Sequence, residues 1–251
     1  MSNSLIFDTI PRRVKRNKFL LTDTFTTNNF SGTDTEELYQ ENLKKQPADW
    51  CYRTNPVKYT VNSLGYRTEE FKKIDWANSI VIFGCSYVFG VGVDDKDTMP
   101  YYLSQLTGMP VVNMGVGGSS IGYSFHNSLI LRDGYPTPKA VIQMWSGADR
   151  TVYYYKKRLE SFGAWNADKS PYMRAWAEDQ DHAETHALFA SKASNWLWKD
   201  TKYFEGSYFY ETAKLLDCYF VKPKDFARDL IHYGKHTHYN VALEIIKQLK
   251  L

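Results

Sequence analysis

The sequence predicts an α/β fold in which helices cover both faces of a doubly wound parallel sheet, giving three layers. Three short apolar runs, each typical of a buried strand, lie at residues 80–84, 110–115 and 140–145. Helical patterns separate these runs, and strands that alternate with helices at this spacing favour a parallel sheet. Right-handed crossovers then bring the carboxyl ends of all three strands to one edge of the sheet.

The composition is ordinary for a globular protein and favours a single domain. The chain has 251 residues, of which 43% are hydrophobic and 24% are charged, and this length suffices for one well-buried α/β domain. Tyrosine and tryptophan are in excess, with 19 and 7 residues, which suits a carbohydrate or aryl surface as well as a bulky core. The formal net charge of +3 is too small to predict a nucleic-acid partner. The one dense basic run, residues 12–18, is expected to be a solvated arm.

Cysteine usage and hydropathy indicate a reducing compartment. The cysteines, Cys51, Cys85 and Cys218, have an odd count and no metal-ligand spacing, so we expect no disulfide framework, no metal and no cofactor. His182 and His186 lie one helical turn apart, but the acidic residues around them favour a solvated face. No stretch approaches the roughly 18 apolar residues of a membrane span, and the first residues lack the order of a secretion signal. We expect a cytoplasmic protein as encoded, or one that leaves by lysis or in a particle.

The first 56 residues are polar and are expected to form an arm that packs on the main domain, residues 57–251. Within the arm, residues 35–45 begin with glutamates and end with lysines, as the helix dipole favours, so a short helix is predicted. Residues 57–61 alternate between apolar and polar side chains, which predicts a half-buried strand. The next four residues, 62–65, are Asn-Ser-Leu-Gly and predict a turn.

Two helices join the three predicted strands. Residues 98–108 have a capping threonine, an early proline and a terminal glycine, as helix ends prefer. A second helix is expected from about residue 119 to 132. Because the strands end at one edge, we expect Ser86, Gly118 and Ser146, which follow them, to lie near each other.

The segment 151–217 is rich in tyrosine and tryptophan and is predicted to be a helical insertion that partly covers the edge of the sheet. A long segment that is joined to this edge at both ends favours a position beside the site; the alternative is that its rings only fill its own core. Residues 216–221 predict a late strand. Apolar residues at helical spacing in 240–249 predict a last helix that packs on the sheet.

Ser86 is the first candidate for chemistry. It follows a buried strand at a sharp break, and so it stands at the carboxyl end of the sheet, where open α/β folds place their sites. A serine needs a base that takes its proton and a third group that orients the base. Asp229 and His232, three residues apart and just ahead of the last helix, are the candidates for these roles.

These residues resemble the motifs of the SGNH (GDSL-type) hydrolases. The strings Gly84-Cys-Ser86, Asn113-Met-Gly-Val-Gly-Gly118 and Asp229-x-x-His232 occur in the order of that family. The resemblance implies a flavodoxin-like sheet in which Ser86 is the nucleophile, His232 the general base and then acid, and Asp229 the orienting carboxylate. It also implies an oxyanion hole formed by the N–H groups of Ser86 and Gly118.

The resemblance extends over about residues 57–150 and 225–248. Within it, residues 59–67 are similar to a segment found ahead of the serine motif in some phage-type and polysaccharide-linked members. A phage-encoded protein that is released or virion-associated is therefore the alternative to a cytoplasmic one. A simple hairpin is the neutral interpretation of the same segment.

The chain departs from the family's pattern at two places. The third motif, Gly-x-Asn-Asp, supplies an asparagine amide to the oxyanion hole, but residues 145–150 contain no asparagine. Since losing one such donor costs roughly 3 kcal/mol in the transition state, either Ser146, Arg150 or another group replaces it, or the enzyme is slow, or the chemistry differs. Cys85 stands where the family has aspartate. As an inward-pointing neighbour of Ser86 it is the less favoured nucleophile.

We therefore expect a serine esterase that hydrolyses small acyl esters, with acetyl as the preferred group, through an acyl-serine intermediate. The expected partner is a small ester or an acetylated carbohydrate, with no nucleic acid and no membrane; the sequence indicates no oligomeric state. The alternatives are acyl transfer to a saccharide and a catalytically weak binding or structural protein on the same fold.

Overall fold

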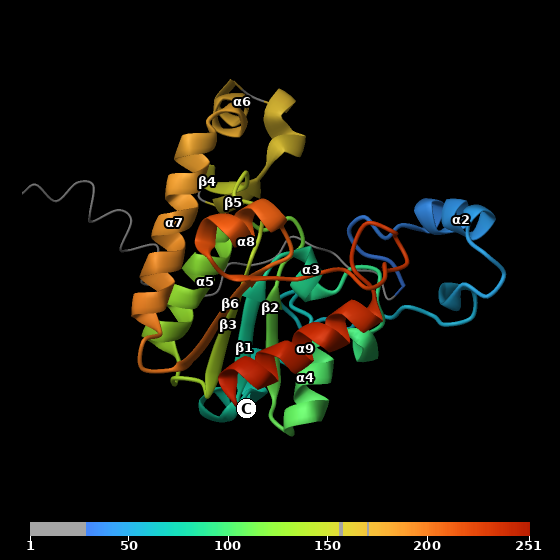
Figure 1. Cartoon of the computed structure of the whole chain (residues 1–251), viewed down its shortest axis with the longest axis horizontal. Coiled ribbons are helices and arrows are strands. Elements are labelled where there is room, and N and C mark those ends of the chain that lie inside the picture. Colours follow the sequence, from blue (N-terminus) through green and yellow to red (C-terminus); the bar gives the residue numbers. More distant parts are fainter. Residues whose placement is uncertain (1–28, 156–157, 170) are drawn as a thin grey trace, which may run out of the picture.

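The computed structural model describes residues 29–155, 158–169 and 171–251. Its centre is a five-stranded parallel sheet with the strand order β2-β1-β3-β6-β7 (Figure 1). The strands are β1 (Ile80–Gly84), β2 (Val111–Gly115), β3 (Ala140–Trp145), β6 (Lys202–Ser207) and β7 (Tyr219–Phe220). The predicted parallel α/β fold is confirmed. The basic run at 12–18 and the first half of the predicted arm lie outside the described residues.

Side chains along β1 alternate between the two faces of the sheet, and helices cover each face, which gives three layers. Ile80 and Ile82 pack in one core cluster with side chains of α4 (Met99–Thr107) and α9 (Lys235–Leu249). Val81 and Phe83 point to the opposite face and pack in a second cluster with side chains of α5 (Ile121–Gly134). The helix α7 (Gln180–Leu197) lies beside α5 on that face (Figure 1). Both faces of β1 are buried, and this explains why every residue of the strand is apolar.

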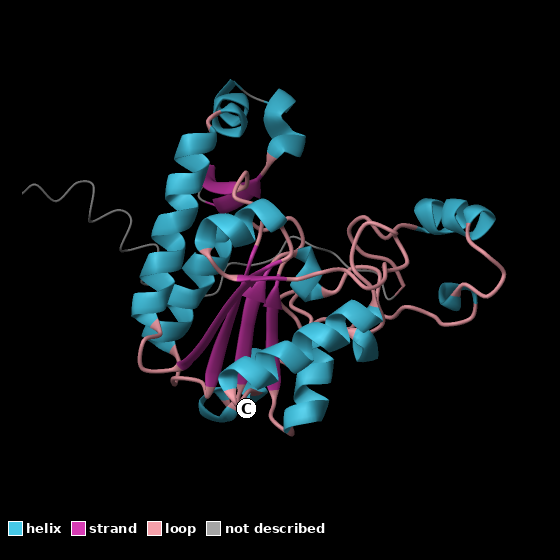
Figure 2. Cartoon of the chain, viewed as in Figure 1, coloured by secondary structure: helices cyan, strands magenta, loops and turns pink. Residues whose placement is uncertain are grey.

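The predicted helices around the sheet are confirmed. In α4, Thr98 caps the N-terminus and Gly108 ends the helix in the left-handed region. Ahead of the sheet, α2 (Glu36–Lys45) is capped by Thr35, and Figure 2 shows it on loops beyond the sheet. The last helix, α9, begins five residues earlier than its apolar periodicity predicts. Short 3-10 turns occupy Cys51–Arg53, Phe71–Lys73, Trp76–Asn78, Asp95–Asp97 and Ala164–Lys169.

The strand predicted at residues 57–61 is wrong, although its alternation is right. Val57 and Tyr59 are buried, whereas Lys58 and Thr60 are exposed. However, the N–H groups of Lys58 and Thr60 donate to the carboxylates of Asp94 and Asp95 rather than to a neighbouring strand. Side-chain acceptors satisfy the backbone here, and no ladder forms.

The segment 151–217 is helical only in part, so the prediction of a helical insertion needs correction. It contains an antiparallel hairpin of β4 (Thr151–Tyr155) and β5 (Arg158–Phe162), followed by α6 (Pro171–Glu178), α7 and α8 (Tyr210–Leu216). Its strand β6 belongs to the central sheet and pairs with β3. A glutamate inside β6, Glu205, concealed this strand in the sequence. Its carboxylate accepts hydrogen bonds from Trp145, Ser191, Tyr203 and Asn195.

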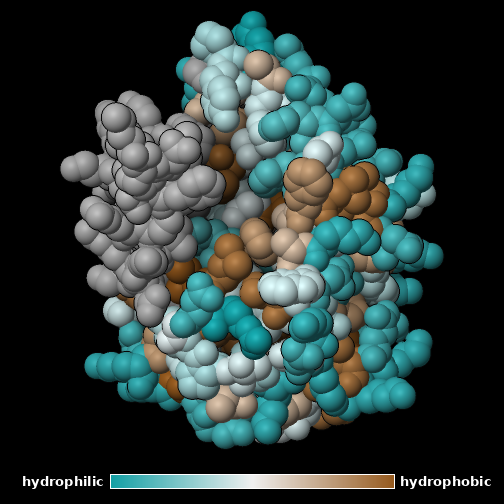
Figure 3. Space-filling model, turned by 90° about the vertical axis from the view of Figure 1, so that its left-hand side faces the viewer, coloured by the Kyte–Doolittle hydropathy of each residue, from teal (hydrophilic) through white to brown (hydrophobic). Residues whose placement is uncertain are grey.

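Figure 3 shows the side of the molecule that faces left in Figure 1, where hydrophobic residues form separate patches among hydrophilic ones. On α7, Phe189 and Trp196 are both 71% exposed. In the described part of the chain, no helix is both long and apolar enough to span a membrane.

Candidate active site

Ser86 lies where the structure turns sharply from a strand into a helix. It is the first residue of α3 (Ser86–Phe89), and Cys85 alone separates it from the end of β1. The turn depends on Gly84, because a Cβ there would lie 2.4 Å from a methyl group of Val88 and 2.9 Å from the carbonyl oxygen of Met144. Close approach of α3 to the strand ends therefore fixes Ser86 at the carboxyl edge of the sheet.

The structure brings the three predicted residues together. His232 Nε2 lies 2.7 Å from Ser86 Oγ, and His232 Nδ1 lies 2.7 Å from Asp229 Oδ2. Asp229 and His232 are 2% and 6% exposed, whereas Ser86 is half-buried and can be reached from solvent. A hydroxyl, an imidazole and a carboxylate are thus joined in one line, which is the geometry that activates a serine.

The loop from Ala227 to Tyr233 presents Asp229 and His232 on the same side. Ala227 and His232 are joined by a backbone hydrogen bond, and Leu230 lies in the left-handed region with φ +57°. Left-handed backbone at a residue other than glycine costs free energy and is found mainly where the surroundings enforce it. Here it lets the N–H groups of Ile231 and His232 both donate to Asp229 Oδ1.

The Asp229 carboxyl is held as a carboxylate. Burial, the largest influence, raises its pKa, but the hydrogen bonds and charge of His232 and a hydrogen bond from Thr33 lower it, and the net pKa falls below its usual range. A buried carboxylate that accepts several hydrogen bonds remains ionised at neutral pH. It can therefore balance a positive imidazolium.

Gly118 lies in a turn tied to the strand that carries Ser86. The Ser119 hydroxyl and the Val116 N–H both donate to the carbonyl oxygen of Gly84, each at 3.0 Å. Gly118 itself has φ +69°, which only glycine adopts readily. Among the described residues, no backbone hydrogen bond is donated by the N–H of Gly118 or of Ser86.

The loop after β3 has no side-chain amide where the family's third motif has asparagine. Ala148, which precedes Asp149, has its N–H bonded to Thr212 Oγ1 at 3.1 Å. Ser146 is fully buried, and its hydroxyl has no partner in the described part of the chain. The Arg150 guanidinium lies over the rings of Trp165 and Phe209, at 4.9 and 4.8 Å.

Cys85 points into the protein, as the alternation along the strand predicts. Its side chain is fully buried, whereas the neighbouring Ser86 is half-buried. The thiol is free rather than disulfide-bonded. Its burial leaves Ser86 as the accessible nucleophilic side chain of this turn.

The other histidines lie outside this arrangement. His182 and His186 form edge contacts with the Trp176 ring, at 4.5 and 5.8 Å between centroids. His238 is 1% exposed and accepts a hydrogen bond from the Met99 N–H at the start of α4. Burial, the main cause, lowers its pKa to about 3, so it is a neutral structural acceptor.

A pocket of about 620 Å³ is lined by Tyr87, the residue after Ser86, although Ser86 and His232 themselves do not line it. The Tyr87 ring contacts His232 at 4.6 Å and stacks on Tyr208 at 4.7 Å between centroids. Aromatic rings and three carboxylates line the pocket. Among its lining residues are Tyr87, Trp176, Tyr208, Phe209, Tyr210, Phe220, Tyr233, Asp149, Glu184 and Glu211.

The segment 59–67 braces the loop that follows Ser86. The Arg67 guanidinium lies inside the loop and donates to the carbonyl oxygens of Phe89, Gly90 and Val93. Tyr59 OH accepts from the Gly92 N–H at 2.7 Å. This segment therefore supports the Ser86 side of the site from behind, as more than a simple hairpin.

Sequence reasoning missed two side chains that contact the histidine or its carboxylate. Tyr87 follows Ser86 directly, but no pattern indicates which way a ring in a four-residue helix points. Thr33 lies in a Thr/Asn-rich stretch without periodicity. Its contact with Asp229, 196 positions away, has no signal in a single sequence.

Comparison with known proteins gives distant likenesses. The sequence matches no protein-family model, and no curated protein matches it. A carbohydrate esterase family 2 enzyme with a carbohydrate-binding domain, from Corynascus thermopiles (Myceliophthora fergusii), is 13% identical with a TM-score of 0.42, over 69% of this chain and 67% of that one. The psychrotrophic esterase EstA from Pseudoalteromonas sp. is 11% identical with a TM-score of 0.40, over 69% and 96%. AlinE4, an SGNH-hydrolase family esterase, is 14% identical with a TM-score of 0.35, over 59% and 77%.

Proposed function

We propose that this protein is a serine esterase that cleaves small oxygen esters through an acyl-Ser86 intermediate. The observation that carries the proposal is the pair of 2.7 Å contacts that join Ser86 Oγ to His232 and His232 to Asp229. In this geometry His232 Nε2 takes the Ser86 proton as Oγ attacks the ester carbonyl. The Asp229 carboxylate accepts from Nδ1–H and stabilises the imidazolium.

The reaction then proceeds in two halves. His232 gives its proton to the leaving alcohol oxygen, the bond between that oxygen and the carbonyl carbon breaks, and the acyl group stays on Ser86 Oγ. A water molecule next gives a proton to His232 and attacks the acyl carbon. The acid leaves as the proton returns to Ser86. In both halves, the N–H groups of Ser86 and Gly118 donate to the carbonyl oxygen as it becomes negative.

For the substrate we infer a short acyl group, with acetyl preferred, carried by a carbohydrate. The pocket beside Tyr87 has a volume typical of small-molecule sites. Its aromatic rings offer faces for sugar rings, and Asp149, Glu184 and Glu211 offer acceptors for sugar hydroxyls. A long acyl chain would instead require an apolar channel, because desolvating carboxylates is unfavourable.

The first test measures turnover of a short-chain aryl ester by the wild-type protein, Ser86→Ala and Cys85→Ser. Ser86→Ala should abolish turnover, while Cys85→Ser should keep most of it. Retained activity in Ser86→Ala, or loss of activity only in Cys85→Ser, would contradict the assignment of the nucleophile. A series of aryl esters should show a preference for acetate over octanoate, and a steep rise of kcat/KM with chain length would refute the choice of substrate.

Acyl transfer to a saccharide is the second candidate function, because the ring-lined pocket next to Ser86 can exclude water and hold an acceptor sugar. The acyl-enzyme half of the reaction is the same for both. Partition of a labelled acetyl group between water and added saccharides separates them. If the acetyl group is released only to water, whichever sugar is added, the esterase is supported and acyl transfer is refuted.

A further inference from the structure

A residue of the N-terminal arm contacts the Asp229–His232 pair directly. Thr33 Oγ1 donates a 2.6 Å hydrogen bond to Asp229 Oδ2, the oxygen that lies 2.7 Å from His232 Nδ1. Thr33 Oγ1 also lies 3.4 Å from that ring nitrogen. The hydroxyl therefore sits at the junction between carboxylate and imidazole.

A four-residue turn places Thr33. The N–H of Ser31 donates to the carbonyl oxygen of Asp34 at 3.0 Å, and the N–H of Asp34 donates back to Ser31 at 3.1 Å. The turn continues directly into α2, which Thr35 caps. Two reciprocal hydrogen bonds leave the backbone at Thr33 little freedom, so its hydroxyl is held in place before any substrate binds.

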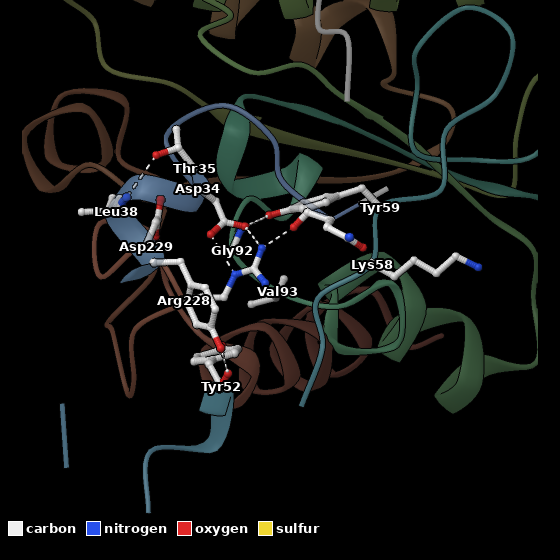
Figure 4. Close-up of polar contacts among 12 residues, drawn as sticks. Asp34, Thr35, Leu38, Tyr52, Lys58, Tyr59, Gly92, Val93, Arg228 and Asp229 are labelled. Carbon is white, nitrogen blue, oxygen red and sulfur yellow. Dashed lines mark hydrogen bonds and ion pairs between the residues drawn. The ribbon is translucent and has the colours of Figure 1, made fainter. Parts of the chain in front are cut away.

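Asp34, the neighbour of Thr33, binds Arg228, the neighbour of Asp229. The Arg228 guanidinium meets both carboxylate oxygens of Asp34, at 2.7 and 2.9 Å, and the two side chains are 5% and 1% exposed. Tyr59 OH donates to the same carboxylate at 2.5 Å, and Figure 4 shows Asp34 between Arg228 and Tyr59. Residues 33–34 and 228–229 are thus paired by two adjacent contacts, one hydrogen bond and one buried ion pair.

We propose that Thr33 is a positioning residue of the active site, which keeps the Asp229 carboxylate turned toward His232 Nδ1. The inference rests on the proposed function. Asp229 Oδ1 is fixed by two N–H groups of its own loop, whereas the contacts of Oδ2 within the described residues are Thr33 and the His232 ring. Thr33 is exposed, so without its hydroxyl water could reach Oδ2 and weaken its contact with His232. The N-terminal arm thus contributes a positioning residue to the site.

Few titratable groups other than His232 surround the Asp229 carboxylate in the described part of the chain. Burial and, to a lesser extent, the charge of Asp229 raise the pKa of Tyr52 and Tyr87, so both stay neutral. The Arg228 guanidinium is bound to Asp34. Since the Thr33 hydrogen bond is one of the influences that lower the pKa of Asp229, its removal should let the carboxyl take up a proton at a higher pH.

The experiment compares Thr33→Val, which keeps the shape and removes the hydroxyl, with Thr33→Ser, which keeps the hydroxyl. Thr107→Val is the matched control, because Thr107 Oγ1 also donates a short hydrogen bond, 2.7 Å to the Leu103 carbonyl oxygen, but lies at the end of α4, outside the site. For Thr33→Val we expect kcat on a short aryl ester to fall about tenfold and KM to change by less than about twofold, a loss typical of a hydrogen bond to a charged group. The pKa of the Asp229 carboxyl, followed by NMR of its carboxyl carbon, should rise.

Thr33→Ser and Thr107→Val should both behave like the wild-type enzyme. Thr33→Ala, which adds no methyl group, is the second variant and should lose the same factor in kcat as Thr33→Val. Wild-type kcat and an unchanged pKa of Asp229 in both, while Ser86→Ala is inactive, would overturn the role of Thr33 and leave the esterase standing. An equal loss in Thr33→Ser would also overturn it, since packing alone would then explain the effect. Activity in Ser86→Ala would instead remove the proposed function itself.

Discussion

A buried arginine supports each half of the active site, but the two bind different partners. Arg67 lies behind the Ser86 loop and Arg228 next to the Asp229–His232 loop, with side chains 4% and 5% exposed. Arg228 is bound by one buried carboxylate, that of Asp34. Arg67 meets a partly exposed carboxylate, Asp95, but donates mostly to backbone carbonyl oxygens, those of Lys58, Phe89, Gly90 and Val93.

This difference predicts how each half responds to the loss of its arginine. Backbone carbonyl groups cannot be removed by substitution. If Arg67 is lost, no second substitution can therefore remove the unsatisfied acceptors of the Ser86 loop. A buried ion pair is different, because losing one charge leaves the other uncompensated, whereas losing both can cost little. A second substitution should therefore restore stability on the Asp229–His232 side, whereas none should restore it on the Ser86 side.

Arg67→Met should have the largest effect on folding. It takes the guanidinium donor away from three buried carbonyl oxygens, of which that of Gly90 keeps only a 3.4 Å contact from the Val93 N–H. An unsatisfied buried carbonyl costs about 1–3 kcal/mol, so we expect the free energy of unfolding to fall by roughly 5 kcal/mol. Chemical denaturation measures the change. Adding Asp95→Asn should restore nothing, because the Asp95 carboxylate can be hydrated; restoration would mean that the ion pair and not the carbonyls holds the loop.

Arg228→Met should cost about 3–5 kcal/mol, as expected when one partner of a buried ion pair is removed. In contrast to the previous case, Asp34→Asn on top of Arg228→Met should recover a large part of the loss. The Tyr59 hydroxyl can still donate to the new amide oxygen. Equal stability of the single and double variants would remove the contrast between the two halves.

Ala148→Asn tests the proposed oxyanion hole. Ala148 lines the pocket beside Ser86 and is half-buried, so a longer side chain has room. An added amide donor should raise kcat on an aryl acetate by about tenfold, less than the full effect of such a donor, since the site did not evolve around it. Ala148→Leu is the size control and should not raise kcat. An unchanged kcat in Ala148→Asn would indicate that another group already donates to the oxyanion.

The smallest expected effect is on the pH dependence of stability. Burial raises the pKa of Asp229, but His232 and Thr33 bring it below its ordinary value of 3.8. A carboxyl whose pKa is lowered by folding stabilises the protein above its unfolded pKa, and this contribution disappears as the pH falls through the folded pKa. Asp229→Asn should therefore be less stable than wild type near neutral pH, with a difference that shrinks between about pH 5 and pH 2. A difference that stays constant with pH would contradict the ionised state of Asp229.

The sequence predicts the parts of the fold whose signals are local. The three apolar runs became β1, β2 and β3, because strands buried on both faces are mostly apolar. The cap residues at Thr98 and Gly108 fixed α4 for an equally local reason. The order of the motifs predicted that Ser86, Asp229 and His232 would meet, and their side chains do.

The parts that could not be predicted depend on partners far along the chain. Glu205 is compatible with a central strand only because α7 and β3 supply donors to its carboxylate. Residues 57–61 alternate like a strand but bind Asp94 and Asp95 instead. The contact between Thr33 and Asp229 spans 196 positions. No periodicity encodes such pairings, and they decide how the arm meets the site.

The central claim is that Ser86 is an activated nucleophile, and labelling by a fluorophosphonate tests it most directly. The reagent needs an activated serine but not the natural substrate, so it also separates an esterase from a binding protein on the same scaffold. We predict one adduct per folded chain, mapped by mass spectrometry to Ser86, with none in Ser86→Ala and a strongly slowed reaction in His232→Gln. Folded wild-type protein that takes up no label, or takes it up elsewhere than at Ser86, would contradict the account.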